Sequence, residues 1–281
     1  MSKPLTEKQV EQFQRDGYLI VKKMFDKEEM EMLLRTAKAD RELTNHSFAS
    51  KDTAGRQSRL TVWNHPGDDL YGMIGRCRRV VDSMEQLLGG EVYHYHSKMM
   101  LKEPKVGGAW EWHQDYGYWY QNGCLLPDMA SCLIAVDKAS KENGCLQLLK
   151  GTHKLGRVEH GKFGDQTGAD PERVKAALER FPLVYFEANP GDALFFHGNT
   201  LHASAPNTSP NPRWSLICCY NTKENDPYKS SHHPQYTKLH KVADVMVKKV
   251  GAKASQNNSF LDPEKDQTGG EKKPEKELAA V

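Results

Sequence analysis

The stretch GDALFFHGNTLHASAPN, residues 191–207, has the pattern of two short strands separated by a turn. Glycine and aspartate at its start favour a turn, the apolar run at 193–196 favours a buried strand, and Gly198-Asn199 favours a second turn. A polar strand follows near His202 and ends before Pro206-Asn207. The stretch therefore predicts β-structure with two histidines, His197 and His202, close to its turns.

The same pattern continues on both sides of this stretch. From Glu91 onward, short apolar runs are broken by glycine, proline and asparagine. The runs cover residues 92–101, 131–136, 145–149, 183–187, 193–196 and 214–220. Many short strands with turn residues between them indicate a β-sandwich or a β-barrel.

Helical sequence precedes the part that is rich in strands. Two capping boxes, Thr6 with Gln9 and Asp26 with Glu29, each open an amphipathic helix. The expected elements are a helix that ends at Gly17, a strand at 18–21, a helix after Asp26, and a helix over 69–88 that ends before Gly89-Gly90. The fold expected is mainly β with flanking helices (α+β), the N-terminal helices buttressing a sheet.

Two other segments have a composition of their own. Residues 154–181 are long and polar, with a helix expected at 171–180, and such insertions in compact domains are often lids over a binding site. After about Gly251, lysine, glutamate, asparagine, glycine and proline dominate, and burial cannot offset the entropy lost on ordering. We expect one domain over residues 1–250 and a disordered tail over residues 251–281.

The composition excludes several classes of partner. The 281 residues contain 39 lysines and arginines against 37 aspartates and glutamates, so no overall basic field favours nucleic acid. No stretch approaches the ~20 apolar residues that cross a membrane, and no apolar signal segment opens the chain. The six cysteines form no Cys-x-x-Cys pair, so we expect reduced thiols. These features predict a cytoplasmic protein whose partner is a small molecule, with no nucleic acid and no membrane involved.

Histidine and carboxylate residues indicate a metal site. His113 and Asp115 follow a β-like run, and side chains two residues apart on a strand share a face. His197 and His202 both compete for the third ligand position. Two histidines and one carboxylate leave coordination positions open, as oxygen-activating iron(II) requires. An antiparallel return of the chain would place Arg213 beside His202, where its guanidinium suits a carboxylate.

The joint spacing of these residues resembles the phytanoyl-CoA dioxygenase family. The shared pattern is His113-x-Asp115, then His202-x-Ser204, then Arg213 eleven residues beyond that histidine. The likeness is greatest to members of the L-proline trans-4-hydroxylase type and covers roughly residues 5–225. It extends to Glu91-Val-Tyr93, Trp112-His-Gln-Asp-Tyr116, Glu142-Asn-Gly144, Gly151-Thr-His153 and Pro210-Asn-Pro-Arg213.

The resemblance implies a fold and a role for particular residues. The fold is the double-stranded β-helix, a jelly-roll or cupin-like architecture. His113, Asp115 and His202 match the iron ligands, which places His202 ahead of His197. The residues that match contacts of 2-oxoglutarate are Arg213, at its distal carboxylate, with Ser204 beside it, and Trp119, His96 and Lys102.

The resemblance also implies an activity. The chain is expected to be an Fe(II)- and 2-oxoglutarate-dependent dioxygenase that uses O2, with ascorbate as a reductant, and acts as a monomer or homodimer. It would hydroxylate a small molecule, an amino acid such as proline or a related amine, with release of succinate and CO2. Because Asp115 is a carboxylate rather than alanine or glycine, the site has no vacancy for a halide, which favours hydroxylation over halogenation.

Two alternatives stay open from the sequence. His96 and Met100 stand where proline and ectoine hydroxylases carry glutamine and asparagine, so the substrate can differ from proline. One alternative is a hydroxylase of an acyl-CoA or another lipid-derived substrate. The other is a catalytically silent sensor that binds 2-oxoglutarate or a metal.

Overall fold

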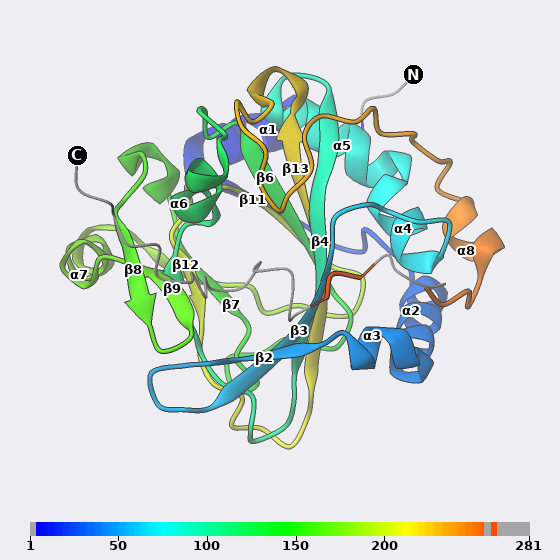
Figure 1. Cartoon of the computed structure of the whole chain (residues 1–281), viewed down its shortest axis with the longest axis horizontal. Helices are drawn as coiled ribbons and strands as arrows, with labels where there is room; N and C mark the ends of the chain where they lie inside the picture. Colours follow the sequence, from blue (N-terminus) through cyan, green and yellow to red (C-terminus); the bar gives the residue numbers. More distant parts are fainter. Residues whose placement is uncertain (1–3, 256–259, 263–281) are drawn as a thin grey trace, which may run out of the picture.

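Two antiparallel sheets face each other in the computed structural model, which describes residues 4–255 and 260–262 (Figure 1). The larger sheet has the strand order β1-β11-β6-β13-β4-β3-β2, and the smaller has the order β10-β7-β12-β5. The strands β8 and β9 form a separate hairpin. This arrangement is the expected jelly roll, a mainly β fold with flanking helices.

The strands and helices have the following bounds. The larger sheet contains β1 (Tyr18–Val21), β2 (Phe48–Lys51), β3 (Gln57–Trp63), β4 (Val92–Lys102), β6 (Met129–Ala135), β11 (Ala193–His197) and β13 (Arg213–Thr222). The smaller contains β5 (Trp110–His113), β7 (Leu146–Leu149), β10 (Leu183–Tyr185) and β12 (His202–Ser204), and the hairpin contains β8 (His160–Phe163) and β9 (Gln166–Ala169). The α-helices are α1 (Glu7–Asp16), α2 (Lys27–Ala39), α3 (Arg41–Asn45), α4 (Leu70–Arg76), α5 (Arg78–Leu88), α6 (Asp115–Trp119), α7 (Pro171–Arg180) and α8 (Met246–Val250).

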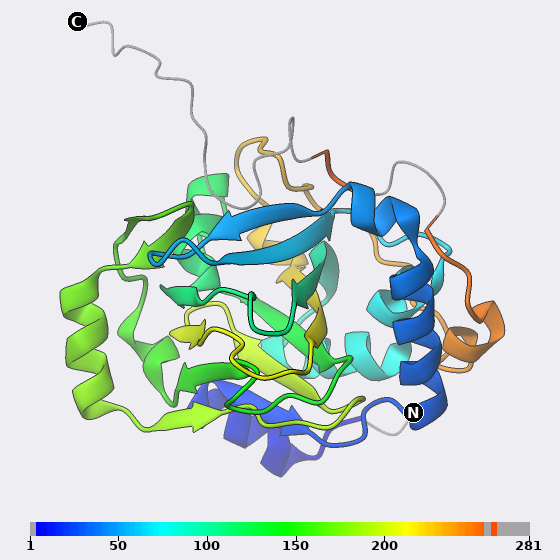
Figure 2. The same cartoon turned by 90° about the horizontal axis from the view of Figure 1, so that it is seen from below.

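The N-terminal helices cover the outer face of the larger sheet, as the sequence predicts (Figures 1 and 2). Both capping boxes form, Thr6 with Gln9 at α1 and Asp26 with Glu29 at α2. Gly17 ends α1 in a left-handed conformation that glycine adopts without a steric penalty. The apolar sides of α1, α2, α4 and α5 join one buried cluster with the outward side chains of the sheet. This packing covers one face of the larger sheet and leaves its other face to line the space between the sheets.

The helix expected at 69–88 is two helices, α4 and α5, with a break at Cys77. Cys77 has extended backbone angles and forms a parallel bridge with Val242. The amide of Arg78 donates to the carbonyl of Val242, and the amide of Val242 donates to the carbonyl of Arg76, so these groups of Arg76 and Arg78 do not take part in a continuous helical ladder. The apolar period alone does not reveal such a break, because buried residues continue through both helices.

Strand prediction succeeded for the apolar runs and failed for the more polar ones. All six runs expected from residue 92 onward form strands within a few residues of the expected bounds. The strands β2, β3, β8 and β9 were not expected. Polar residues and glycine interrupt their apolar pattern, as in β9, which reads Gln-Thr-Gly-Ala.

The six cysteines are free and buried, as expected. Cys218 and Cys219 project from opposite faces of β13, one into the helix-covered cluster and the other into the space between the sheets. Within the described residues, no helix has the length and apolar character that crossing a membrane requires.

Part of the segment expected as a tail contacts the domain. Phe260 is 6% exposed and its ring lies against Trp63 and Tyr71. The amide of Leu261 donates to the carbonyl of Val62. The rest of that expectation concerns residues 256–259 and 263–281, which lie outside the described residues.

Candidate metal centre

The two histidines of the expected triad lie opposite each other in the smaller sheet. His113 ends β5, His202 begins β12, and the two are register partners in this antiparallel pair. We expected Asp115 to share a strand with His113, but Asp115 is the first residue of α6. The strand ends at His113, and the turn through Gln114 brings the carboxylate back toward the histidines. The ligand atoms of the three side chains all lie within 4.8 Å of one another.

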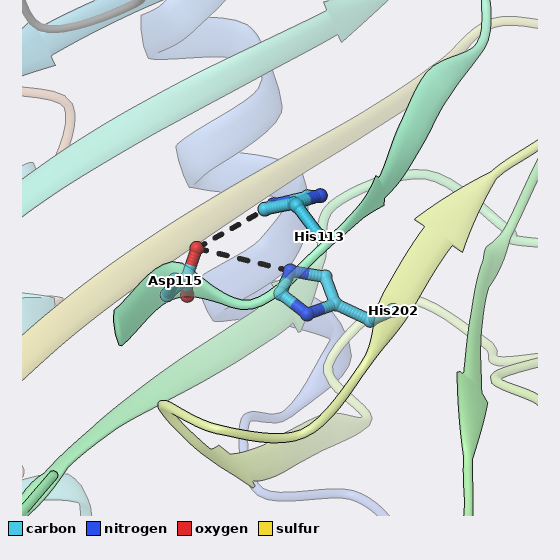
Figure 3. Close-up of side chains that lie close together, drawn as sticks. All are labelled: His113, Asp115 and His202. Carbon is cyan, nitrogen blue, oxygen red and sulfur yellow. Dashed lines mark ion pairs between the residues drawn. The ribbon is translucent and has the colours of Figure 1, made fainter. Parts of the chain in front are cut away.

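The imidazoles are oriented for a metal by their own backbone. Nδ1 of His113 donates to the carbonyl of Glu111, and Nδ1 of His202 donates to the carbonyl of Thr200. Because carbonyls only accept, the proton is on Nδ1 and the Nε2 lone pair is free. Nε2 of His113 is 3.6 Å and Nε2 of His202 is 3.8 Å from Oδ1 of Asp115 (Figure 3).

Two hydroxyl groups hold the carboxylate of Asp115. Tyr118 donates to Oδ1 over 2.8 Å, and Ser131 of β6 donates to Oδ2 over 2.9 Å. Sequence reasoning missed both residues, since Tyr118 is one of several aromatics in its segment and Ser131 lies on a distant strand. They keep the carboxylate in one orientation.

The charges suit a divalent metal. Burial alone would raise the pKa of Asp115, but Lys98 and the imidazoles of His113 and His202 hold it well below its usual range. Burial lowers the pKa of His202 to about 3, so this imidazole is neutral. One carboxylate and two imidazole nitrogens on one side of a buried space are the donors that iron(II) prefers in oxygenases. The residues present therefore fit the ion that the sequence implies.

His197, the competing histidine, is oriented away from this centre. Its Nδ1 accepts a hydrogen bond from the amide of Asn199, and its ring contacts those of Phe13 and His153. The described part of the chain contains one cluster of potential metal ligands, and it comprises His113, Asp115 and His202.

The sequence suggested an antiparallel return that places Arg213 beside His202, and this prediction is wrong. The chain crosses from the smaller sheet to the larger, and β13 pairs with β4, so Arg213 lies opposite Lys102. Its guanidinium donates to the carbonyl of Gly144 and to the hydroxyl of Ser215, and its Nε has no partner among the described residues. Lys102 donates to the hydroxyl of Ser204 over 2.7 Å. Three expected cosubstrate contacts are thus adjacent.

These cations lack a carboxylate partner within the described residues. Burial, and next the charge of Arg213, lower the pKa of Lys102 well below its usual range. Burial lowers the pKa of Arg213 to about 10, which leaves it protonated at neutral pH. Two buried cations side by side are unfavourable until an anion joins them. The carboxylate of 2-oxoglutarate fits this position.

His96 and Trp119 lie together in the cluster between the sheets. The two rings meet edge-on at 5.7 Å, and neither His96 Nδ1 nor Trp119 Nε1 has a hydrogen-bond partner in the described chain. His233, which sequence reasoning missed, stacks on His96 with 4.6 Å between the ring centroids. It comes from an irregular segment after β13, and only the dipeptide His232-His233 could have drawn attention to it.

The segment expected as a lid is attached to the metal centre at its start. The side chain of Gln114 donates to the carbonyls of Gly156 and Asn199 and accepts from the amide of Val158. The segment contains the β8–β9 hairpin and α7, the latter at the expected residues (Figure 2). Its closure over a substrate stays a prediction.

Comparison with known proteins gives matches over most of the chain. The model of the family described as Phytanoyl-CoA dioxygenase (PhyH) matches residues 13–215. The L-proline trans-4-hydroxylase of Streptomyces griseoviridis is 32% identical over 179 residues, which cover 58% of this chain and 67% of the relative. The ectoine dioxygenase of Bordetella parapertussis is 26% identical over 236 residues, which cover 79% and 77%.

Solved structures share the fold. EctD from S. alaskensis with bound Fe superposes with a TM-score of 0.72 at 21% identity, covering 86% of this chain and 89% of that chain. The same protein with 2-oxoglutarate and 5-hydroxyectoine gives a TM-score of 0.70 at 23% identity, covering 86% of each chain.

Proposed function

The chain belongs to the phytanoyl-CoA dioxygenase family, and we propose that it hydroxylates an amino acid such as proline, or a related amine. It is a dioxygenase that depends on iron and 2-oxoglutarate and hydroxylates a small molecule. The observation that carries the proposed substrate class is the 32% identity to a curated L-proline trans-4-hydroxylase. The buried site, with its cluster of potential metal ligands, is compatible with hydroxylation of this substrate class.

We assign the iron to His113, Asp115 and His202. Their free Nε2 atoms and the carboxylate oxygen converge on one point, and the backbone carbonyls of Glu111 and Thr200 fix both imidazoles. When bound, iron(II), O2 and 2-oxoglutarate supply the oxidising power: one oxygen atom goes to the substrate carbon, and the cosubstrate leaves as succinate and CO2.

The rest of the site orients the cosubstrate. Arg213 and Lys102 bind the distal carboxylate and neutralise it, and Ser204 holds the lysine ammonium in place. His96 and Trp119 offer buried nitrogen atoms without partners on the adjacent wall. The two sheets exclude bulk water from the centre, which strengthens each of these interactions.

Succinate release tests the function. We expect the Fe(II)-loaded enzyme to release succinate faster with an amino acid such as L-proline than without substrate, and mass spectrometry to detect a product with one added oxygen. The matched control is Asp115→Asn, which removes the ligand charge and should abolish both signals. Turnover with acyl-CoAs alone would replace the proposed substrate class with a lipid-derived one. Failure of every candidate to raise succinate release would favour the sensor.

We also propose that the enzyme works in the cytoplasm as a monomer or homodimer. Size-exclusion chromatography with light scattering, at several protein concentrations, distinguishes these states. A larger assembly would contradict the proposal.

A further inference from the structure

Lys98 places a positive charge in the space between the sheets, next to the candidate metal centre. It lies on β4, opposite Val62 on one side and Ile217 on the other, both of which belong to the cluster between the sheets. Side chains alternate along a strand, so Lys98 shares this face with Met100, a member of the same cluster. The side chain of Lys98 is 12% exposed.

Lys98 has one ion-pair partner within the described residues, and that pair is long. Its Nζ is 4.0 Å from Oδ1 of Asp115, at the outer limit of an ion pair, and no hydrogen bond from Nζ occurs within the described residues. Asp115 already accepts from Tyr118 and Ser131. A buried ammonium needs close hydrogen-bonded partners to offset its desolvation.

Binding of metal and cosubstrate does not supply that partner. The charge of Asp115 is shared with the metal when the metal is bound. The distal carboxylate of 2-oxoglutarate is matched by Arg213 and Lys102, and its other end belongs at the metal. Lys98 then remains a cation beside the reacting position, with no anion assigned to it.

Apart from Asp115, the described neighbours of Lys98 named here bring no negative charge to it. The stacked rings of His96 and His233 form the adjacent wall. Burial, followed in His96 by the charge of Lys98, lowers the pKa of both imidazoles well below the usual range, so they are neutral. The apolar side chains of Val62 and Ile217 flank the lysine and add no charge. The missing anion therefore has to come with the substrate.

We propose that Lys98 binds a carboxylate of the substrate and makes the enzyme selective for small carboxylic acids over their uncharged derivatives. The inference rests on the proposed function and narrows it, because amines without a carboxylate are then poor substrates. A charge-assisted hydrogen bond in a buried site corresponds to about a tenfold to hundredfold change in affinity.

Binding of matched acids and amides tests this role without turnover. Calorimetry under anaerobic conditions would measure L-proline against L-prolinamide, and L-pipecolate against its amide, on enzyme loaded with Fe(II) and 2-oxoglutarate. Of L-proline and L-pipecolate, we expect the wild-type protein to bind the one with the higher affinity about tenfold to hundredfold more tightly than its amide. Lys98→Met should remove the difference, and Lys98→Arg should retain most of it. Lys8→Met, an exposed lysine of α1, should behave as wild type.

Several results would overturn the proposal. A wild-type protein that binds no acid of the panel more tightly than its amide contradicts it, as does a Lys98→Met protein that keeps the preference. If Lys98→Met instead weakens binding of 2-oxoglutarate, the lysine binds the cosubstrate. If it weakens only binding of the metal, the lysine positions Asp115. Should Lys98→Met not fold, judged by circular dichroism, Lys98→Gln replaces it. Succinate release by the wild-type protein with L-proline, compared with release without substrate, tests the proposed function separately, because a rise can occur whether or not Lys98 binds the carboxylate.

Discussion

Lys102 of β4 and Arg213 of β13 lie directly opposite each other, both buried, and in the described chain neither is paired with a carboxylate. Like charges opposite each other across a ladder destabilise a sheet, and burial adds the cost of desolvation. Among the described residues, the hydrogen bonds of the two side chains go to neutral oxygens, including Ser204 Oγ and the carbonyl of Gly144. This arrangement favours binding of an anion over stability of the empty protein.

Replacing one of these cations should therefore weaken the binding of 2-oxoglutarate without lowering the stability of the ligand-free protein. We expect Lys102→Met to weaken 2-oxoglutarate binding by about tenfold or more, since a charge-assisted contact is lost. The ligand-free protein should be as stable as wild type or more stable, because a buried charge is removed. Calorimetry with 2-oxoglutarate and urea unfolding measure the two effects. Unchanged affinity for 2-oxoglutarate would contradict the role assigned to Lys102.

The choice between two histidines can be tested by spectroscopy. Anaerobic addition of iron(II) and 2-oxoglutarate should give a weak metal-to-ligand charge-transfer band in visible light. His202→Ala should abolish this band, because one of three ligands is lost. His197→Ala is the matched control and should keep it, since the ring of His197 contacts Phe13 and His153 instead. A band that survives in His202→Ala would refute the assignment.

Gly144 should be intolerant of a side chain. Its φ is 72°, and a Cβ there would clash with the carbonyl oxygen of Ala205, close to the ammonium of Lys102. We expect Gly144→Ala to lower stability and to weaken 2-oxoglutarate binding. Gly89→Ala is the control, because Gly89 has a φ of 78° with open space around the added Cβ, so backbone strain alone costs about 1 kcal/mol. Equal effects of the two changes on 2-oxoglutarate binding would argue against the clash.

Acid should destabilise the metal-free protein through buried neutral histidines. Burial lowers the pKa of His94 to about 4, so the unfolded chain binds a proton there that the folded chain does not. The stabilisation is complete above the unfolded pKa of about 6.5 and is lost as the pH falls toward 4. His94 should account for about 2 kcal/mol of the stability lost between pH 7.5 and 5. Urea unfolding of wild type and His94→Gln would measure this, and equal losses in the two proteins would disprove it.

The domain boundary at residue 250 can be tested through Phe260. Its ring contacts Trp63 and Tyr71, and deleting a buried phenylalanine side chain costs about 3 kcal/mol or more. We expect Phe260→Ala to lower the free energy of unfolding by this order. Val106→Ala, an exposed apolar residue, should change it little. An unchanged stability in Phe260→Ala would support a domain that ends near residue 250.

The sequence by itself determined the local elements and the chemistry of the centre. Capping residues and apolar runs specify where α1, α2 and most strands begin, because these signals act over a few neighbouring residues. The spacing of His113, Asp115 and His202, together with Arg213, resembles that of the phytanoyl-CoA dioxygenase family, and this resemblance implied the iron- and 2-oxoglutarate-dependent class. These residues are recognisable because an open iron(II) site needs few donors of particular types.

The tertiary structure decided how distant segments meet. The pairing of β13 with β4, rather than with β12, sets Arg213 against Lys102, and no local signal specifies which strands pair. The same holds for Ser131 at the carboxylate of Asp115, for His233 on His96, and for the inward position of Lys98. Each of these contacts joins residues on different elements. The physical reason is that packing between the sheets depends on the global register, whereas the sequence signals are local.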